Sequence, residues 1–337
     1  MTGDRSQDTH VRAHAAASSR RRLLTAAALA PVLTMAGGTG AARAADAAHG
    51  QPAPPMRPVQ PVPTAPADWA AVAEVLGRPG NMLRDTTYHT GFPRRDLLVV
   101  SDGVVVTPGL ALGTHAAFIR YADGTTMLMG DMVVTERELQ QVADAWQAHG
   151  IELTALHKHL LAQTPDLWWV HVHGHGRDAV ALARGLRAGL DRTGTPPPVP
   201  PDRRTPVDLD VAGMEAALGA RGSVEDGLFK VVFVRRETIT DGHLVLPPGL
   251  GSTSAFNFQP VGGGRAALSG DFAMLAEEVP QVLRALRRGG VKLVELHNHH
   301  LAESPRLFFT HFWAVDDGVR LARTLRTAVD ATAQTVP

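Results

Sequence analysis

Residues 155–176 read ALHKHLLAQTPDLWWVHVHGHG, and residues 295–316 read ELHNHHLAESPRLFFTHFWAVD. The two stretches align without a gap, because Leu-His-x-His, a Pro and a further His recur at one constant interval. The match extends upstream, where Gly130-Asp131 corresponds to Gly270-Asp271. A repeat of this length is a whole domain and not one turn of a solenoid. The sequence therefore predicts an internal duplication that gives two homologous domains.

This repeat divides the chain into predicted segments. They are a signal peptide at 1–44, a Pro-rich linker at 45–67, a first repeat at 68–193, a second Pro-rich linker at 194–207 and a second repeat at 208–332. Because the first linker has no apolar period, we expect it to be disordered and semi-extended. The sequence leaves open whether the repeats pack together or stand apart on the second linker, and hence whether a site is shared between them.

Each repeat is predicted to be an α+β domain, an antiparallel sheet with helices packed on one face. Thr135 and Glu138 form a capping box that opens a helix ending at Gly150. The first repeat is also predicted to have strand-like stretches at 97–106 and 116–134, with hairpin turns at 101–103 and 123–124, and strands at 151–161 and 167–173. Its other predicted helices are at 69–76 and 179–190. The second repeat is predicted to follow the same order, with helices at 279–288 and 318–329 and strands at 291–299 and 307–313.

The N-terminus has the pattern of an export signal. Three arginines follow Ser19, a weakly apolar run covers 25–35, and Ala42-Arg43-Ala44 is a cleavage site of the A-x-A type. Adjacent arginines before an Ala-rich run favour twin-arginine export, with an ordinary secretory signal as the alternative. The apolar run is too short to span a bilayer, which needs about 20 residues. We therefore expect a secreted or envelope protein, cleaved near Ala44.

Composition excludes several classes of protein. The chain has no Cys, which rules out disulfides, Cys-ligated zinc, iron–sulfur clusters and a lipid-modified N-terminal Cys. It carries 33 Lys+Arg and 33 Asp+Glu, but six of the arginines lie in 1–44, so the remainder is mildly acidic. A mildly acidic protein is a poor partner for nucleic acid. The expected partner is an unknown small-molecule or cell-envelope ligand, with no nucleic acid and no membrane span.

Histidines carry the main chemical signal. Alternate residues of a strand share a face, so two neighbouring strands with His-x-His would bring several imidazoles together. Imidazole suits Zn, Cu, Fe and Ni. We predict a divalent transition metal, with zinc favoured and copper or iron as alternatives. The candidate ligands are His157, His159, His171, His173, His175, His297, His299 and His311.

Two carboxylates are candidates for a general base in such a site, Glu303 and Asp131. Asp131 and its mate Asp271 could equally orient a ligating His or bond local backbone amides. The spacing of His297, His299 and Glu303 also matches the first metal motif of cupins, although His311 follows too soon after Glu303. Histidines that only hydrogen-bond, or that line a groove for an anion without metal, are the remaining alternative.

The two His-rich stretches are similar to those of the LppY/LpqO family, a family of unknown function also known as DUF1259. The resemblance covers both repeats, and it implies an envelope-associated or secreted protein without supplying a reaction. The family name refers to lipoproteins, whereas this chain has no Cys for lipidation. Two functions follow as expectations. One is a zinc-dependent hydrolase; the other is a non-catalytic envelope protein that binds metal or a cell-wall component. A closed four-ligand site would favour the second, and a three-ligand site in a pocket the first.

Overall fold

The computed structural model describes residues 57–199 and 206–337. The predicted signal peptide, the start of the first linker and the middle of the second lie outside these residues. Within the described residues, no helix is both long and apolar enough to cross a membrane.

In the first repeat, a main antiparallel sheet carries helices on one face. The sheet has the order β1 (Asn81–Leu83), β2 (Thr87–Pro93), β5 (Gly113–Arg120), β6 (Thr126–Thr135), β9 (Leu167–Gly176) and β7 (Glu152–His157). Its helices are α1 (Ala70–Leu76), after a 3-10 turn at Pro66–Trp69, α3 (Glu136–Ala148) and α4 (Ala179–Leu190), and a short α2 (Pro108–Ala111) precedes β5. A small sheet contains β4 (Val104–Val106), β3 (Val99–Ser101) and β8 (Gln163–Thr164).

The second repeat has the same plan. Its main sheet has the order β10 (Ser223–Glu225), β11 (Leu228–Arg235), β14 (Thr253–Gly262), β15 (Arg265–Met274), β18 (Phe308–Asp317) and β16 (Lys292–His297), and β19 (Gln334–Thr335) pairs with β11. The helices are α5 (Val211–Leu218), α6 (Val279–Arg288) and α7 (Gly318–Val329). The small sheet contains β13 (Leu244–Leu246), β12 (Ile239–Asp241) and β17 (Glu303–Ser304). The predicted α+β class with two tandem domains is confirmed.

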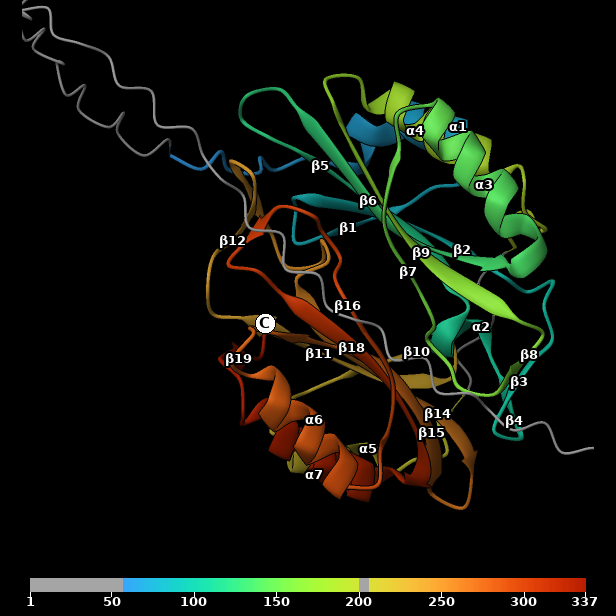
Figure 1. The fold of residues 1–337 in the computed structure, drawn as a ribbon, viewed down its shortest axis with the longest axis vertical. Coiled ribbons are helices and arrows are strands. Elements are labelled where there is room, and N and C mark those ends of the chain that lie inside the picture. The colour runs from blue at the N-terminus through green and yellow to red at the C-terminus, as the bar shows by residue number, and fades with distance from the viewer. Residues whose placement is uncertain (1–56, 200–205) are drawn as a thin grey trace, which may run out of the picture. The chain divides into compact units, whose positions relative to one another are not determined.

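Both faces of each main sheet are buried. Along β6, Leu128 and Val134 pack against the helices of their own repeat, whereas Met129 belongs to a core shared with the second repeat. In β15, Leu268 likewise packs against the helices of its own repeat, and Ala273 belongs to the core shared with the first repeat. The helices of the two repeats therefore lie on opposite outer sides, and the sheets face each other between them (Figure 1). This answers the question of whether the repeats pack together.

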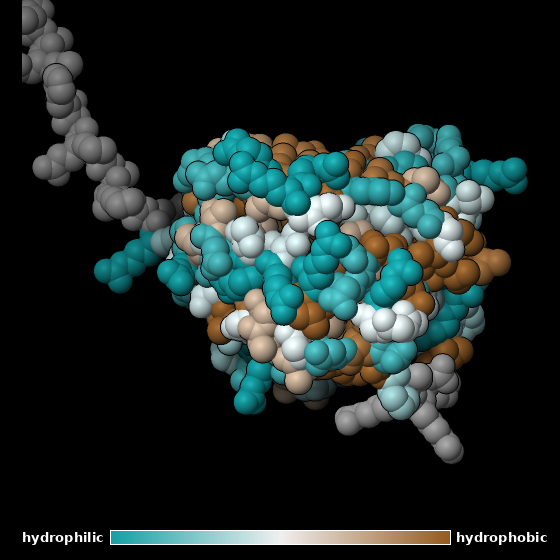
Figure 2. Space-filling model, turned by 90° about the horizontal axis from the view of Figure 1, so that it is seen from below, coloured by the Kyte–Doolittle hydropathy of each residue, from teal (hydrophilic) through white to brown (hydrophobic). Residues whose placement is uncertain are grey.

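Helices turn polar faces outward. In α7, Leu321 and Leu325 are buried, while Arg320 and Arg323 are exposed. Figure 2, which looks at the molecule from below Figure 1, shows hydrophilic side chains spread across that face with apolar ones between them. The apolar stripe of the helix therefore faces its own sheet, as its amphipathic sequence requires.

Polar contacts also join the two repeats. The side-chain oxygen of Gln259 accepts hydrogen bonds from the backbone N and Oγ1 of Thr107 at 2.8 and 2.9 Å, and its Nε2 donates to Val105 O at 2.8 Å. Lys292 Nζ lies 2.7 Å from Asp102 Oδ2. These contacts join the small sheet of the first repeat and its flanking residues to the main sheet of the second.

The described part of the first linker differs from the disordered segment that we expected. Val59 N donates to His243 O at 2.7 Å in the second repeat, and Val62 N donates to Arg120 O at 2.9 Å in the first. Residues 57–66 therefore lie across both repeats. The physical reason is that an extended Pro-rich chain still offers the backbone groups of its non-Pro residues to neighbouring strands.

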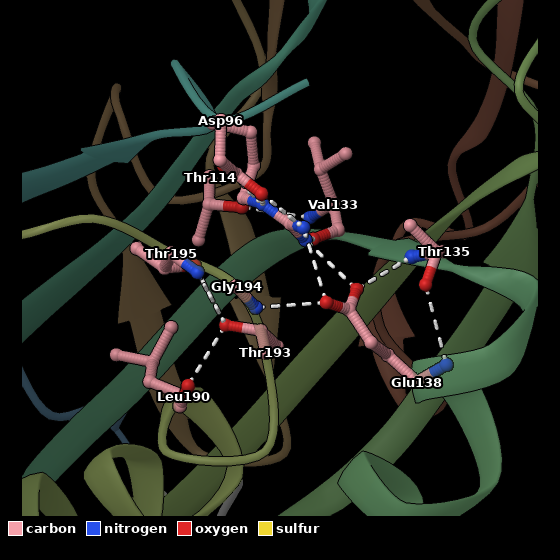
Figure 3. Close-up of polar contacts among 10 residues, drawn as sticks. Asp96, Thr114, Val133, Thr135, Glu138, Leu190, Thr193, Gly194 and Thr195 are labelled. Atoms are coloured by element: carbon pink, nitrogen blue, oxygen red, sulfur yellow. Dashed lines mark hydrogen bonds and ion pairs between the residues drawn. The ribbon is translucent and has the colours of Figure 1, made fainter.

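One buried ion pair occurs in both repeats. Arg94 donates to both carboxylate oxygens of Glu138 at 2.9 and 3.1 Å. Glu138 also accepts from the backbone N–H of Thr135 and of Gly194, which ties the end of the repeat to the start of α3 (Figure 3). Arg235 and Glu278 repeat this arrangement in the second copy. The capping box predicted at Thr135 is thus confirmed and belongs to a larger network.

Arg94→Met is expected to lower the free energy of unfolding by about 3 kcal/mol, because it leaves Glu138 without its cation. The Arg94 side chain is 1% exposed. The matched control is Arg187→Met, which removes an exposed i,i+4 pair with Asp191 and should cost less than about 1 kcal/mol. Urea denaturation measures both, and equal losses would contradict a structural role for the Arg94 network.

Candidate metal centre

Six imidazoles from the two repeats converge between the sheets. The ring centroids of His157 and His297 are 4.2 Å apart. His159 of the first repeat lies 3.7 Å from His311 of the second. His171 of the first lies 4.1 Å from His299 of the second. The cluster therefore belongs to both repeats, and neither repeat contains it alone.

Strand register explains how these side chains meet. On β6 and β9, Asp131 is directly opposite His171. On β15 and β18, Asp271 is directly opposite His311 in the same way. Directly opposed residues project from the same face of a sheet. Each repeat thus presents one carboxylate and one imidazole at the centre of the face that it turns to the other repeat.

The paired His-x-His residues lie at and just after the ends of β7 and β16. His157 ends β7 and His297 ends β16, so His159 and His299 lie in the following loops. The loop of the second repeat is held to the first, because Thr154 Oγ1 donates to His299 O at 2.6 Å. These contacts bring His-x-His from both repeats to the same central region.

Two equivalent ligand sets result. The first ligand set contains Asp131, His157 and His159, with His311 from the second repeat. The second ligand set contains Asp271, His297 and His299, with His171 of the first repeat, whose ring lies 4.1 Å from that of His299. His157, His171 and His297 form a further group of potential ligands that joins the two sets.

In the first set, His159 Nε2 lies 2.9 Å from His157 Nε2 and 3.2 Å from Asp131 Oδ2. In the second set, His299 Nε2 lies 3.2 Å from His297 Nε2 and 2.9 Å from Asp271 Oδ2. In the second set, two imidazole nitrogens and one carboxylate oxygen therefore lie within 4.8 Å of one another. In the first set, the imidazole nitrogen of His159 lies close both to that of His157 and to the carboxylate of Asp131. Ligand atoms on one small cation have separations of this size.

Hydrogen bonding settles which nitrogen of two rings carries the proton. His299 Nδ1 lies 3.1 Å from Gly251 O, and His311 Nδ1 lies 3.0 Å from Gly270 O. A carbonyl oxygen only accepts, so Nδ1 donates and Nε2 of each neutral ring presents a lone pair. The Nε2 lone pair of His299 then faces the Asp271 carboxylate, a repulsive contact that a cation between the two would make favourable.

Several buried polar atoms of the cluster have no hydrogen-bond partner, which also favours a bound cation. Among the described residues, buried atoms without a hydrogen bond include Asp131 Oδ1, Asp271 Oδ1, both ring nitrogens of His171 and His311 Nε2. Leaving such an atom unpaired costs about 1–3 kcal/mol. A metal ion that accepted several of these lone pairs would remove much of that cost. The donor set of imidazoles with one carboxylate suits zinc and its neighbours in the first transition row.

Electrostatics keeps the histidines in the neutral form that binds metal. Burial, and then the neighbouring imidazoles, lower the pKa of His157 and of His297 well below the usual value. Burial lowers the pKa of His299 to about 3 and that of His311 to about 3. These rings are therefore uncharged at neutral pH, with lone pairs available.

The carboxylates of the cluster differ from one another. Burial alone would raise the pKa of Asp131, but His159 and His171 outweigh it and hold this pKa below its usual range. Burial raises the pKa of Asp271 to about 6. Burial, and then the charge of Asp271, raise the pKa of Glu295, whose Oε1 is 3.0 Å from His297 Nδ1, to about 7. Neither of these two atoms has a hydrogen-bond partner, so the contact is a close approach and not a hydrogen bond.

His173 and His175 do not join the central cluster. They follow His171 on the same face of β9, but each step of two residues moves about 6.8 Å along the strand. His173 instead meets Asp241 and His300 of the second repeat. His173 and Asp241 border a cavity of about 320 Å³, which His175 also lines.

Glu303 lies outside every ligand group among the described residues. Its side chain is 1% exposed, and it accepts hydrogen bonds from Arg306 Nη1 at 3.3 Å and from Leu307 N at 3.2 Å. The cupin-type combination of His297, His299 and Glu303 is therefore not assembled. Asp131, the other candidate base, is part of the first ligand set.

Sequence reasoning missed three members of these groups as ligands. Asp271 was considered only as the mate of Asp131, and His300 was passed over beside His299. One feature of the sequence could have pointed to Asp241: it is an acidic residue at the position where the first repeat has Ser101. The strand pairing confirms this correspondence, because Asp241 lies opposite Glu303 and Ser101 lies opposite Gln163.

Comparison with known proteins identifies a family. A family model described as Domain of Unknown Function (DUF1259) matches residues 70–192 and again residues 212–331. None of the curated proteins compared with the chain matches it.

Two solved structures show a faint likeness. One is a trimeric bacterial microcompartment shell protein, PduB, at 12% identity and a TM-score of 0.19, covering 74% of this chain and 88% of that one. The other is EtuB from Clostridium kluyveri, at 11% identity and a TM-score of 0.18, with the same coverage of 74% and 88%. TM-scores this low carry no argument about fold or function.

Proposed function

The chain belongs to the family described as Domain of Unknown Function (DUF1259), and we propose that it is a metal-binding protein whose two repeats jointly hold a buried pair of divalent transition-metal ions. The observation that carries this proposal is the exchange of ligands between repeats. Each ligand set takes a carboxylate and two imidazoles from one repeat and its fourth residue from the other. Two ions are expected, one in each set.

Zinc is the proposed ion, with copper or iron as the alternatives. Four protein ligands of the nitrogen and carboxylate type suit a closed, tetrahedral zinc site. The imidazoles of His157, His171 and His311 are 1%, 3% and 4% exposed. Burial of this degree leaves little room for a substrate, so the paired centre is proposed to bind metal and hold the repeats together, without catalysing a reaction.

Export of the folded protein is part of the same proposal. The arginine pair and A-x-A site of residues 1–44 support a twin-arginine signal. Such export carries folded proteins, so the metal would be bound before the protein reaches the envelope or the medium. A cell-envelope or small-molecule ligand is the proposed partner.

Metal analysis of the full chain, purified without a His-tag, tests the proposal. The protein is stripped with a chelator, offered Zn, Cu, Fe, Ni, Co or Mn in turn, dialysed and measured by elemental analysis. The variant Asp131→Asn/Asp271→Asn, which keeps side-chain size and loses one ligand oxygen of each set, is expected to retain two metal equivalents fewer than the wild type. Glu303→Gln removes a buried carboxylate outside both sets and should change nothing. A wild type that retains none of these metals would overturn the proposal.

A further inference from the structure

A third group of potential ligands lies apart from the paired centre. Asp241 Oδ2 is 3.3 Å from His173 Nε2 and 3.6 Å from His300 Nδ1. The side chains of His173, Asp241 and His300 are 12%, 10% and 1% exposed. One residue comes from the first repeat and two from the second, so this group also spans the interface.

Hydrogen bonding again shows a lone pair facing a carboxylate. His300 Nε2 lies 3.4 Å from Leu250 O, which can only accept, so Nε2 carries the proton and Nδ1 presents a lone pair to Asp241. His173 Nε2 and His300 Nδ1 are both buried without a hydrogen-bond partner. Asp241 Oδ2 and His300 Nδ1 therefore present electron pairs, and His173 Nε2 lies beside them without a partner. A cation between them would satisfy all three atoms.

The duplication gives each residue of the third group a counterpart in the other repeat, and none of these counterparts is a metal-ligating residue. Trp313 corresponds to His173, Leu160 to His300 and Ser101 to Asp241. Trp313 and Leu160 are each 1% exposed and belong to an apolar core. The fold therefore does not need an imidazole at the positions of His173 and His300, since the other half of the molecule fills them with Trp313 and Leu160, nor a carboxylate at the position of Asp241, where it has Ser101.

The third group also differs from the paired centre in its access to solvent. Two of its members, His173 and Asp241, border the cavity of about 320 Å³ that Glu152, Thr154 and His175 help to line. This volume has room for several water molecules. The lining residues carry two carboxylates and no Lys or Arg, which favours a cation.

We propose that His173, Asp241 and His300 form a separate metal site, open to the cavity, that binds one exchangeable divalent ion of the first transition row. Two imidazoles and one carboxylate leave further coordination positions for water or a small ligand. The paired centre has a different role: its ligand sets are closed. This third site involves other residues and is independent of the proposal for the paired centre.

Metal titration of the full chain tests this third site, with Co²⁺ as the probe ion and azide as a probe of open positions. Asp241→Asn removes one ligand oxygen without changing side-chain size. Glu152→Gln removes a negative charge from the same cavity and leaves the three ligands in place. His173→Phe is a second variant that keeps a ring of similar size. Circular dichroism confirms that each variant is folded.

Wild type and Glu152→Gln should bind one Co²⁺ whose visible absorption changes on adding azide. In Asp241→Asn and His173→Phe this equivalent should be lost, with affinity lower by at least about 100-fold, and the response to azide should disappear. Asp131→Asn/Asp271→Asn should keep both, which separates this site from the paired centre. The proposal is overturned if Asp241→Asn binds as much metal as the wild type, if Glu152→Gln loses as much as Asp241→Asn, or if azide has no effect on the wild type.

Discussion

Replacing His311 by Ala is expected to weaken metal binding at a set built mainly by the other repeat. His311 belongs to the second repeat, but its ring lies 3.7 Å from that of His159, and its potential ligand atom lies near those of His157 and His159. Even hydrogen-bond partners of metal ligands change affinity by 10- to 100-fold. Loss of a ligand should therefore lower the affinity of the first set by at least about 100-fold.

A double-mutant cycle makes this prediction specific. If His159 and His311 bind the same ion, the double variant should lose less binding free energy than the two single variants together. His243→Ala is the control, because His243 lies near the repeat interface, beside Asp123, and outside every group of potential ligands among the described residues. Isothermal titration with Zn²⁺ measures each affinity, and His311→Gln guards against loss of folding. Additive losses, or a His311→Ala protein with wild-type affinity, would contradict a ligand set shared between repeats.

Acidification of the metal-free protein should lower its stability steeply below about pH 6.5. Burial lowers the pKa of His157, His171, His297, His299 and His311 from the usual 6.5. Below pH 6.5 the unfolded chain therefore binds protons that the folded chain does not. Each such His costs roughly 1.4 kcal/mol of stability per pH unit until its folded pKa is reached.

Two carboxyl groups act in the opposite direction. The pKa values of Asp271 and Glu295 are raised to about 6 and about 7, so their folded forms bind protons before their unfolded forms do. With five histidines against two carboxyl groups, the net effect is a loss of several kcal/mol between pH 6.5 and 5. The measurement is chemical denaturation of chelator-treated protein at pH 7.5 and 5.0. In His157→Ala/His297→Ala the difference should shrink, whereas His243→Ala should keep it. Equal stability of the wild type at both pH values would disprove the prediction.

Much of the fold was predictable because its signals are local. The helices predicted at 179–190, 279–288 and 318–329 have those bounds in the structure. Strand β2 was missed because Thr87–Pro93 contains a Gly and a Pro, which conceal the alternation. Strand β1 has three residues, too few to show an alternation. The linker at 57–66 was misjudged for another reason: its order comes from hydrogen bonds to both repeats, and nothing in its own residues announces those partners.

The candidate site was predictable in composition and only partly in arrangement. Strand alternation places His171 and His173 on one face of the sheet. It does not predict that His299 of the second repeat lies near His171, or that His300 lies near His173. Asp241 lies on a short strand of the small sheet, and its sequence neighbours contain no other ligand.

The sequence by itself determined the duplication, the α+β plan of each repeat and the histidines on its strands, because these depend on periodicity and on spacing within about 20 residues. Only the tertiary structure decided that the imidazoles of one repeat lie against those of the other, and that His173 leaves the central cluster for a cavity. The reason is physical: the packing of two apolar sheet faces sets these distances, and it depends on side chains spread over the whole chain.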